Sequence, residues 1–132
     1  MTKRLLLVLA VPLALAGIIY VGGTAILLYA FTTADPFPPF MADYHPNGSY
    51  AHAGSSFDQF VTHRFPIGSN AQDAIAKIGL ERFRIVASKA GLYQFTWNRH
   101  AGPCGEHYSI ILEENSDGTI AEISGRLRER CL

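Results

Sequence analysis

The chain has 132 residues, 48% of them hydrophobic, and its 11 Lys and Arg balance its 11 Asp and Glu, so the formal charge is zero. This length allows one domain and an appendage. The charge balance removes the general attraction that nucleic-acid-binding proteins have for phosphate backbones, and we expect no nucleic-acid partner.

The apolar residues are concentrated at the N-terminal end. No charged residue occurs between Arg4 and Asp35, and the apolar stretch 5–31 exceeds the roughly 20 residues that a helix needs to cross a bilayer. A cleaved signal peptide is the alternative, but its apolar region usually has only about 7 to 15 residues. The greater length favours an uncleaved membrane anchor over residues 1–34.

Lys3 and Arg4 determine the expected orientation of this anchor. Positively charged residues that flank a membrane span stay in the cytoplasm, and Asp35 and Asp43 follow the span. We therefore expect a single-pass protein of the inner (cytoplasmic) membrane. Its N-terminus would be cytoplasmic and its C-terminal domain periplasmic.

Residues 35–56 are predicted to form a linker, because four prolines within it oppose a helix and favour extended backbone. The linker also carries more aromatic side chains than a passive tether needs: Phe37, Phe40, Tyr44 and Tyr50. The sequence leaves two roles open for these side chains, packing on the membrane surface or docking on the domain.

The domain itself is expected over residues 57–132 and opens with two short helices. Ser55 or Ser56 is a candidate N-cap for the first helix, over residues 57–65, and Pro66 ends it.

The second helix lies within residues 66–80, where Ser69 is the expected N-cap, Asp73 lies in the first turns and Gly79 is the expected C-cap. Its apolar stripe consists of Ala71, Ala74, Ile75 and Ile78.

Alternation with a period of two then predicts four strands. Their apolar faces are Phe83, Ile85 and Ala87; Tyr93, Phe95 and Trp97; Tyr108, Ile110 and Leu112; and Ala121, Ile123, Leu127 and Cys131. Residues 89–91 and 115–118 carry turn signals. A four-stranded antiparallel meander whose apolar face is covered by the two short helices gives an α+β fold in two layers.

His100, Cys104 and His107 follow one another at metal-ligand spacing, H-x3-C-x2-H. Strand alternation puts His107 on the face opposite to Cys104, and a third and fourth ligand are not evident. Nucleophile-elbow and phosphate-binding glycine motifs are also absent from the sequence. We therefore expect no metal, no cofactor and no enzymatic activity.

Cys104 and Cys131 are instead expected to form a disulfide. If residues 115–118 form the hairpin loop, Cys104 lies opposite Glu129 and one diagonal step from Cys131, a separation that overlaps disulfide geometry. An oxidising compartment and a small core that benefits from a covalent crosslink favour the disulfide over a zinc site or a reactive thiol.

Arg126, Arg128 and Arg130 project from the outer face of the last strand, and His107 and Arg99 are expected nearby. One interpretation is a docking patch for an acidic protein, a lipid headgroup or a glycan carboxylate. The more ordinary interpretation is a solvated strand face that prevents edge pairing.

Two segments carry a family resemblance. The residues of the first are Phe65, Gly68, Ser69, Ile75 and Gly79, and those of the second are Asp117, Gly118 and Ile120. With these residues, the region 57–125 resembles the SmpA/BamE-like small envelope proteins, in which a capped helix is followed by a β-meander with an aspartate-glycine turn. Members of that family are typically lipoproteins that scaffold outer-membrane protein assembly. This chain lacks a lipobox cysteine, so the resemblance implies only the character of a binding module.

These observations predict a membrane-anchored periplasmic module for protein interaction or envelope structure, with the membrane and an envelope protein as partners. Two alternatives remain open. One is a small thiol-dependent enzyme that uses Cys104 and a nearby histidine, and the other is an accessory or inhibitor subunit of a membrane complex.

Overall fold

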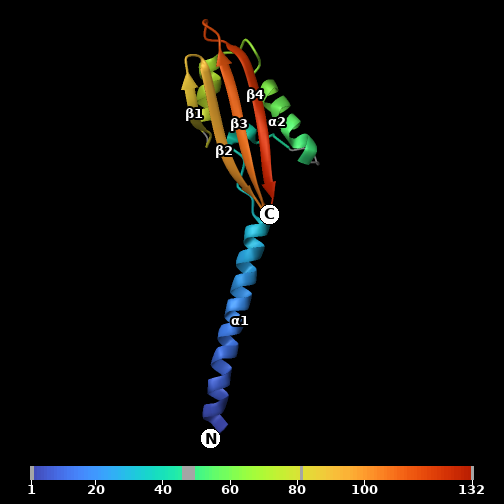
Figure 1. Ribbon diagram of the computed structural model, residues 1–132, viewed down its shortest axis with the longest axis vertical. Helices are drawn as coiled ribbons and strands as arrows, with labels where there is room; N and C mark the ends of the chain where they lie inside the picture. The colour runs from blue at the N-terminus through green and yellow to red at the C-terminus, as the bar shows by residue number, and fades with distance from the viewer. Residues whose placement is uncertain (1, 46–49, 81, 132) are drawn as a thin grey trace. The chain divides into compact units, whose positions relative to one another are not determined.

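The computed structural model describes residues 2–45, 50–80 and 82–131 (Figure 1). Its elements are α1 (Thr2–Thr32), the 3-10 helix η1 (Pro39–Met41), α2 (Tyr50–Arg64), α3 (Ala71–Gly79), β1 (Arg84–Lys89), β2 (Leu92–Ala101), β3 (Cys104–Glu114) and β4 (Ile120–Cys131). The chain divides into two compact units, Met1–Thr33 and Ala34–Leu132.

The first unit is the single apolar helix α1. Its stretch Leu13–Thr32 is 20 residues long, which by length and composition is enough to cross the hydrocarbon core of a bilayer. The hydroxyls of Thr24 and Thr32 donate to the carbonyls of Tyr20 and Leu28, one turn earlier, at 2.9 and 2.7 Å. Both hydroxyls are therefore hydrogen-bonded within the helix, as the apolar interior of a membrane requires.

The second unit is the α+β fold that the sequence predicts. Its sheet has the order β1-β2-β3-β4 with antiparallel neighbours, and the short helices cover one face (Figure 1). The core combines side chains from both layers: Phe57, Val61 and Phe65 of the first helix and its end, Ala71, Ala74 and Ile78 of the second, and Phe95, Trp97, Tyr108, Ile110, Leu112 and Ile123 of the sheet. The predicted apolar faces of α3, β2 and β3 are thus confirmed.

The segment 35–56, predicted as a linker, differs in the structure. Its first part packs on the domain, because Phe40 and Tyr44 are buried in the core and Phe37 contacts Trp97 with ring centroids 6.1 Å apart. Phe37, Phe40 and Tyr44 therefore dock on the domain, one of the two roles that the sequence left open, and the side chain of Tyr50 lies outside the described residues. The compact unit begins at Ala34 and not at Phe57.

Helix α2 also begins within that segment, at Tyr50. Ser55 and Ser56 consequently lie inside the helix and do not cap it. The helix continues because it packs along β4, where a side chain built on Gly54 would lie 3.7 Å from the Leu127 carbonyl oxygen. Tertiary packing here overrides the local capping signal.

The ends of α3 lie one residue later than predicted. Asn70 is the N-cap, and its Oδ1 accepts from the Asp73 N–H at 3.0 Å. Ser69 instead donates its hydroxyl to the Pro66 carbonyl at 2.6 Å. Leu80, in ordinary right-handed conformation, takes the C-cap position expected for Gly79.

Strand β1 does not follow the predicted alternation. Phe83, just before the strand, is buried, but Ile85 and Val86 are 51% and 56% exposed. The register shifts between Ile85 and Ala87, and such a bulge turns side chains away from their expected face. The side chain of Ala87 lies outside the described residues.

The β3–β4 hairpin has a shorter loop than predicted. The Asn115 N–H donates to the Thr119 carbonyl at 2.8 Å, and Gly118 adopts a φ of 83°, which together fit a three-residue loop ending in a left-handed glycine. The register shifts again just after this loop. Ile120 therefore occupies the buried position predicted for Ala121.

Candidate functional site

Cys104 and Cys131 close the end of the β3–β4 hairpin. They lie directly opposite each other, because the three-residue loop and the bulge after it each advance the register by one position relative to the prediction that placed Glu129 opposite Cys104. Their Cα atoms are 4.0 Å apart and their Sγ atoms are bonded at 2.00 Å. A thiol mechanism at Cys104 would first require reduction of this bond.

His100 and His107 do not join Cys104 in a ligand set. His107 lies on the outer face of the sheet, whereas Cys104 lies on the face that the helices cover. Within the part of the chain that the structure describes, no group of three His, Cys, Asp or Glu side chains could hold a metal ion.

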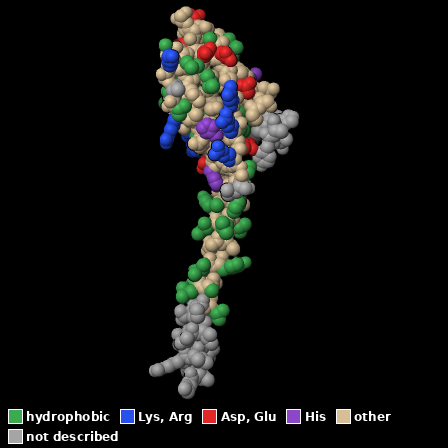
Figure 2. Space-filling model, viewed as in Figure 1, with side chains coloured by type: hydrophobic (Ala, Val, Ile, Leu, Met, Phe, Trp, Pro, Cys, Tyr) green, Lys and Arg blue, Asp and Glu red, His purple; other side chains and the backbone are tan. Residues whose placement is uncertain are grey.

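The outer face of the sheet presents three adjacent cross-strand rows with arginine or histidine side chains, and Arg84 of β1 lies opposite Thr96 beside the third row. In register order across β2, β3 and β4, the rows are His100, Gly105 and Arg130; Asn98, His107 and Arg128; and Thr96, Ser109 and Arg126. We call these nine residues the cationic rows. Figure 2 shows Lys, Arg and His side chains gathered on this face of the domain.

Charge is segregated on this face. The cationic rows contain no carboxylate. The acidic residues Glu113 and Glu122 lie opposite each other in the strand register, nearer the other end of β3 and β4. Residues 34–132 as a whole contain nine Lys and Arg against eleven Asp and Glu, a formal charge of −2. The cationic rows are therefore a local feature of a mildly acidic unit.

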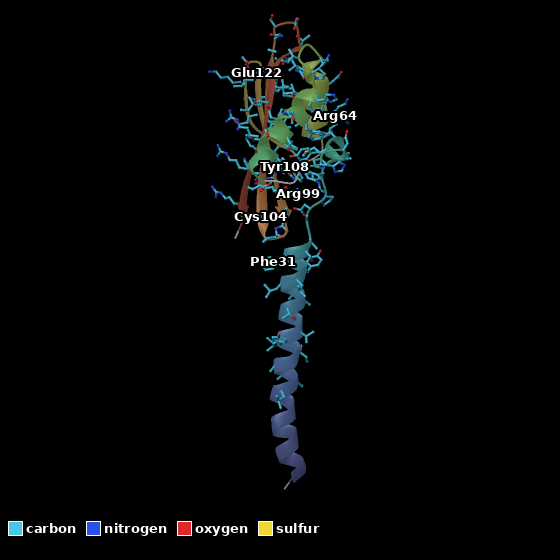
Figure 3. The ribbon with its side chains drawn as sticks, turned by 90° about the vertical axis from the view of Figure 1, so that its right-hand side faces the viewer. Phe31, Arg64, Arg99, Cys104, Tyr108 and Glu122 are labelled. Carbon is cyan, nitrogen blue, oxygen red and sulfur yellow. A yellow bond between two sulfur atoms is a disulfide. The ribbon has the colours of Figure 1, made fainter. Side chains whose placement is uncertain are left out.

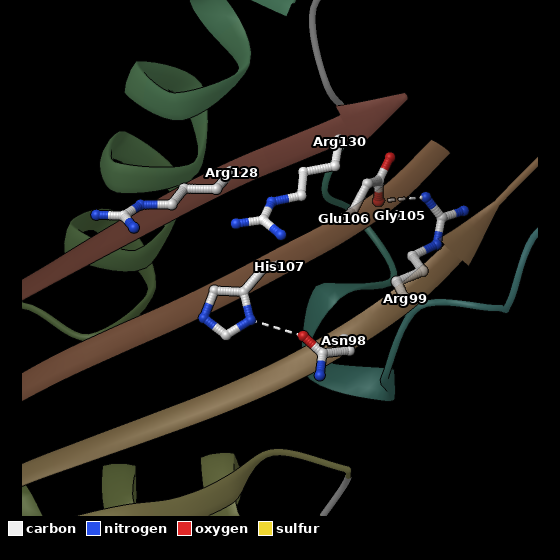
Figure 4. A pocket seen from close by; sticks show the side chains of 7 residues that line it. All are labelled: Asn98, Arg99, Gly105, Glu106, His107, Arg128 and Arg130. Atoms are coloured by element: carbon white, nitrogen blue, oxygen red, sulfur yellow. Dashed lines mark hydrogen bonds and ion pairs between the residues drawn. The ribbon is translucent and has the colours of Figure 1, made fainter. Parts of the chain in front are cut away.

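A pocket of about 460 Å³ opens on the cationic rows, lined by Asn98, Arg99, Gly105, Glu106, His107, Arg128 and Arg130 (Figure 4). His107 Nδ1 and Asn98 Oδ1 are 2.6 Å apart. Because an amide oxygen only accepts, Nδ1 is the donor, and this bond fixes the orientation of the imidazole ring.

The arginines of the cationic rows have no acidic partner among the residues that the structure describes. The ion pairs among the described residues are Arg64–Asp43 and Arg99–Glu106, so none of them involves Arg126, Arg128 or Arg130. The sequence prediction placed these three arginines beside His107, and the structure brings all four together. Whether they bind a partner stays a prediction.

The helix-covered face carries a second polar row, Arg99, Glu106 and Glu129, aligned across the same strands. Figure 3 labels Arg99 of this row together with Tyr108. Arg99 Nη1 lies 2.8 Å from Glu106 Oε2, and the Tyr108 hydroxyl donates to the same oxygen at 2.7 Å. The Arg99 guanidinium also lies 4.0 Å above the Phe37 ring, so it joins the N-terminal segment of the domain to the sheet.

Within the described part of the chain, Glu129 is the member of this row whose carboxylate is incompletely hydrogen-bonded. Its Oε2 is buried and lacks a hydrogen-bond partner among the described residues. Burial, followed by the charge of Glu106, raises the pKa of the Glu129 carboxyl. Burial likewise raises the pKa of Tyr108, and its bond to Glu106 acts in the same direction.

Sequence reasoning missed Gly105, Asn98 and the inner-face row. It placed Arg99 close to the basic patch, whereas the structure directs its charged group to the opposite face. The signal was present in the strand parity, because residues 99, 106 and 129 share the parity of the apolar faces of their strands. Charged residues at positions with the parity of the apolar face, on three neighbouring strands, indicate a polar row on the face that the helices cover.

No protein-family model, curated protein or solved structure matches this chain. The resemblance to SmpA/BamE-like proteins therefore stays a prediction.

Proposed function

We propose that this chain is a single-pass, membrane-anchored periplasmic module that binds an envelope partner through the cationic rows. The observation that carries the proposal is the outer face of the sheet, where three arginines without acidic partners among the described residues gather on a unit of net negative charge. Unpaired cations concentrated on one face attract and orient an anionic partner.

The remaining parts of the proposal rest on two further observations. Helix α1 is long and apolar enough to serve as the anchor. The Cys104–Cys131 disulfide suits an oxidising compartment such as the periplasm. The binding-module character also agrees with the SmpA/BamE-like resemblance, which we retain as a proposal.

A second function, accessory subunit of a membrane complex, is favoured by the edge strand β1. Ile85 and Val86 are 51% and 56% exposed there, and Leu80 after α3 is 82% exposed. Neighbouring exposed apolar side chains on a small domain are typical of contact with another protein. This function would use the edge of the sheet and leave the cationic rows free.

Site-specific photo-crosslinking in intact cells tests both functions. A photo-reactive side chain at Ser109 lies within the cationic rows and preserves every arginine, one at Val86 probes the β1 edge, and one at Gln59, an exposed residue of α2, is the matched control. The proposal expects a reproducible adduct from position 109, and the accessory-subunit function expects one from position 86. Equal yields from positions 109 and 59 would contradict docking through the cationic rows.

A reporter fused after Leu132 tests the compartment separately. An enzyme that is active only outside the cytoplasm should be active in this fusion, whereas activity of a cytoplasmic reporter would remove the periplasmic part of the proposal.

A further inference from the structure

We propose that the pocket on the cationic rows is a binding site for a phosphate group, carried by a small phosphoester or by a lipid headgroup. The inference deepens the proposed function, since it rests on the cationic rows as the binding surface, but it is independent of the anchor and the compartment.

The donors come from two adjacent strands. Arg128 lies directly across from His107, and Arg130 lies directly across from Gly105. A guanidinium presents parallel N–H groups that match two phosphate oxygens at once. Neither arginine is in an ion pair with a described carboxylate, so a ligand would not have to displace an internal partner.

The orientation of His107 supports the same ligand. Its Nδ1 is occupied by Asn98 Oδ1 at 2.6 Å, which leaves Nε2 as the ring nitrogen available to a ligand. Figure 4 shows the imidazole beside the Arg130 guanidinium, whereas the Arg128 guanidinium points away from both and would turn toward them to contact the same ligand. A phosphomonoester has three peripheral oxygens, whereas a carboxylate has only two. The phosphate can accept from both guanidiniums and, when the imidazole carries a proton on each nitrogen, from His107 Nε2 as well.

Gly105 makes the pocket possible. It lies between His100 and Arg130 in its row, where any side chain would project onto the outer face. The volume of about 460 Å³ falls within the range of small-molecule sites. Without a side chain at position 105, the pocket can admit a group as large as a phosphate.

The composition of the cationic rows suits a small charged group within the pocket. The nine residues include no Trp, Tyr, Phe, Leu, Ile or Met, so a strongly charged group fits the pocket better than an apolar anchor. Arginine is also enriched in protein interfaces, so the rows around the pocket remain suited to a protein partner.

The test uses the full chain in a non-ionic detergent with the disulfide intact. Inorganic phosphate, glycerol 3-phosphate and acetate are titrated separately while NMR follows the Gly105 amide and the His107 ring. The expected result is a saturable response to both phosphates at these two residues and a weaker response to acetate. No response to either phosphate would overturn the proposal.

Three variants separate a defined site from diffuse attraction. Arg128→Gln should weaken phosphate binding about tenfold or more, the usual effect of losing a charge-assisted hydrogen bond. Gly105→Val should weaken binding similarly without changing the charge. The fold should tolerate this change, since a Cβ at position 105 approaches no atom closer than the Arg130 carbonyl oxygen, at 3.9 Å.

Lys77→Gln is the matched control, because it removes one charge from the exposed side of α3 and should leave phosphate binding unchanged. Equal effects of Arg128→Gln and Lys77→Gln, together with no effect of Gly105→Val, would show diffuse attraction only and overturn the site. Thermal unfolding of each variant verifies that it is folded.

Nanodiscs distinguish the two sources of the phosphate. With discs of phosphatidic acid, whose headgroup is a phosphomonoester, a response at Gly105 that is lost in Arg128→Gln and absent with phosphatidylcholine identifies a headgroup site. A response to soluble phosphates alone identifies a phosphoester site. Failure of the phosphate titration would leave the crosslinking and topology results of the proposed function unaffected, so the two failures are distinguishable.

Discussion

At the scale of single residues, the row Arg99–Glu106–Glu129 places two carboxylates side by side on the face that the helices cover. Arg99 and the Tyr108 hydroxyl satisfy Glu106, but Glu129 Oε2 has no partner among the described residues. This arrangement favours a neutral Glu129, because only one charge in the pair is balanced by a cation.

We predict that Glu129 makes stability depend on pH. Its pKa is raised above the ordinary value of 4.5 by burial and then by Glu106. The stabilising contribution of the neutral carboxyl is therefore fully present below about pH 4.5 and is lost as pH rises through the higher folded-state pKa. Glu129→Gln, neutral at every pH, should unfold at higher denaturant than the parent at pH 7.

Urea unfolding of the full chain at pH 4.5 and pH 7 measures this difference. Glu122→Gln, which removes an exposed carboxylate from the outer face, is the control and should keep the pH dependence of the parent. An unchanged pH dependence in Glu129→Gln would show that Glu129 is not the titrating group.

We also predict that Arg99→Leu destabilises the domain by about 2 to 3 kcal/mol, because it leaves the mostly buried Glu106 without its cation. The side chains of Arg99 and Glu106 are only 13% and 11% exposed. Arg64→Leu is the comparison, since the Arg64–Asp43 pair is 3.9 Å long and its side chains are 46% and 68% exposed. Its loss should cost about 0.5 kcal/mol or less in chemical denaturation, and equal costs would contradict the prediction.

The residues of the pocket show what sequence can and cannot reveal at this scale. Strand parity places Arg126, Arg128, Arg130 and His107 on one face without any structure. The role of Gly105 could not be predicted, because it depends on which residues lie beside it on the neighbouring strands. Those neighbours depend on the strand register, which is determined at the loop and not at Gly105 itself.

At the scale of secondary-structure elements, α2 and β4 approach each other closely at Gly125. A Cβ at this position would lie 2.9 Å from Val61 Cγ2 and 3.0 Å from Phe57 Cδ1. The Gly125 N–H also donates to Asp58 Oδ1 of α2 at 2.8 Å. The position of α2 over the sheet thus depends on a glycine and one polar contact.

Gly125→Ala should therefore destabilise the domain by about 1 to 3 kcal/mol, the usual cost of overpacking a core. Gly105→Ala is the matched control, since its Cβ has room, and it should be neutral or slightly stabilising because alanine restricts the unfolded chain. Thermal unfolding of both variants measures the difference. If Gly125→Ala unfolds at the temperature of the parent, α2 has more freedom than this packing implies.

Elements differed in how well their sequences predicted them. Strands β2 and β3 are central, so strict alternation determines their buried faces. Strand β1 is an edge strand with a bulge, and the β3–β4 register depends on one extra residue after the loop. A bulge leaves little trace in an apolar pattern, because it shifts a face by one position without changing composition.

At the scale of the whole molecule, the disulfide links positions separated by 27 residues. In the chain-entropy model, a loop of this size stabilises the folded state by about 3.5 kcal/mol. Replacing both cysteines by serine should lower the unfolding free energy by roughly that amount, and the parent under reducing conditions should behave like the variant. Two rapidly alkylated thiols in the unreduced parent would contradict the bond.

The extent of the domain was the least predictable feature at this scale. Prolines between residues 36 and 46 correctly oppose a regular helix there, but they do not prevent an irregular segment from packing. Phe37, Phe40 and Tyr44 bury their rings against aromatic side chains far along the chain, among them Trp97 and Tyr108. Local composition cannot report such long-range contacts.

The hydrogen bond from Gly125 to Asp58 has a consequence for assembly. It occupies a main-chain donor in the middle of β4, an edge strand of the sheet, so a neighbouring molecule cannot extend an unbroken ladder along that side. A filament can grow only if both edge strands of the sheet can pair with a strand of another molecule, and of the two edge strands only β1 can do so without interruption. Self-association through strands should therefore stop at a pair joined about a twofold axis.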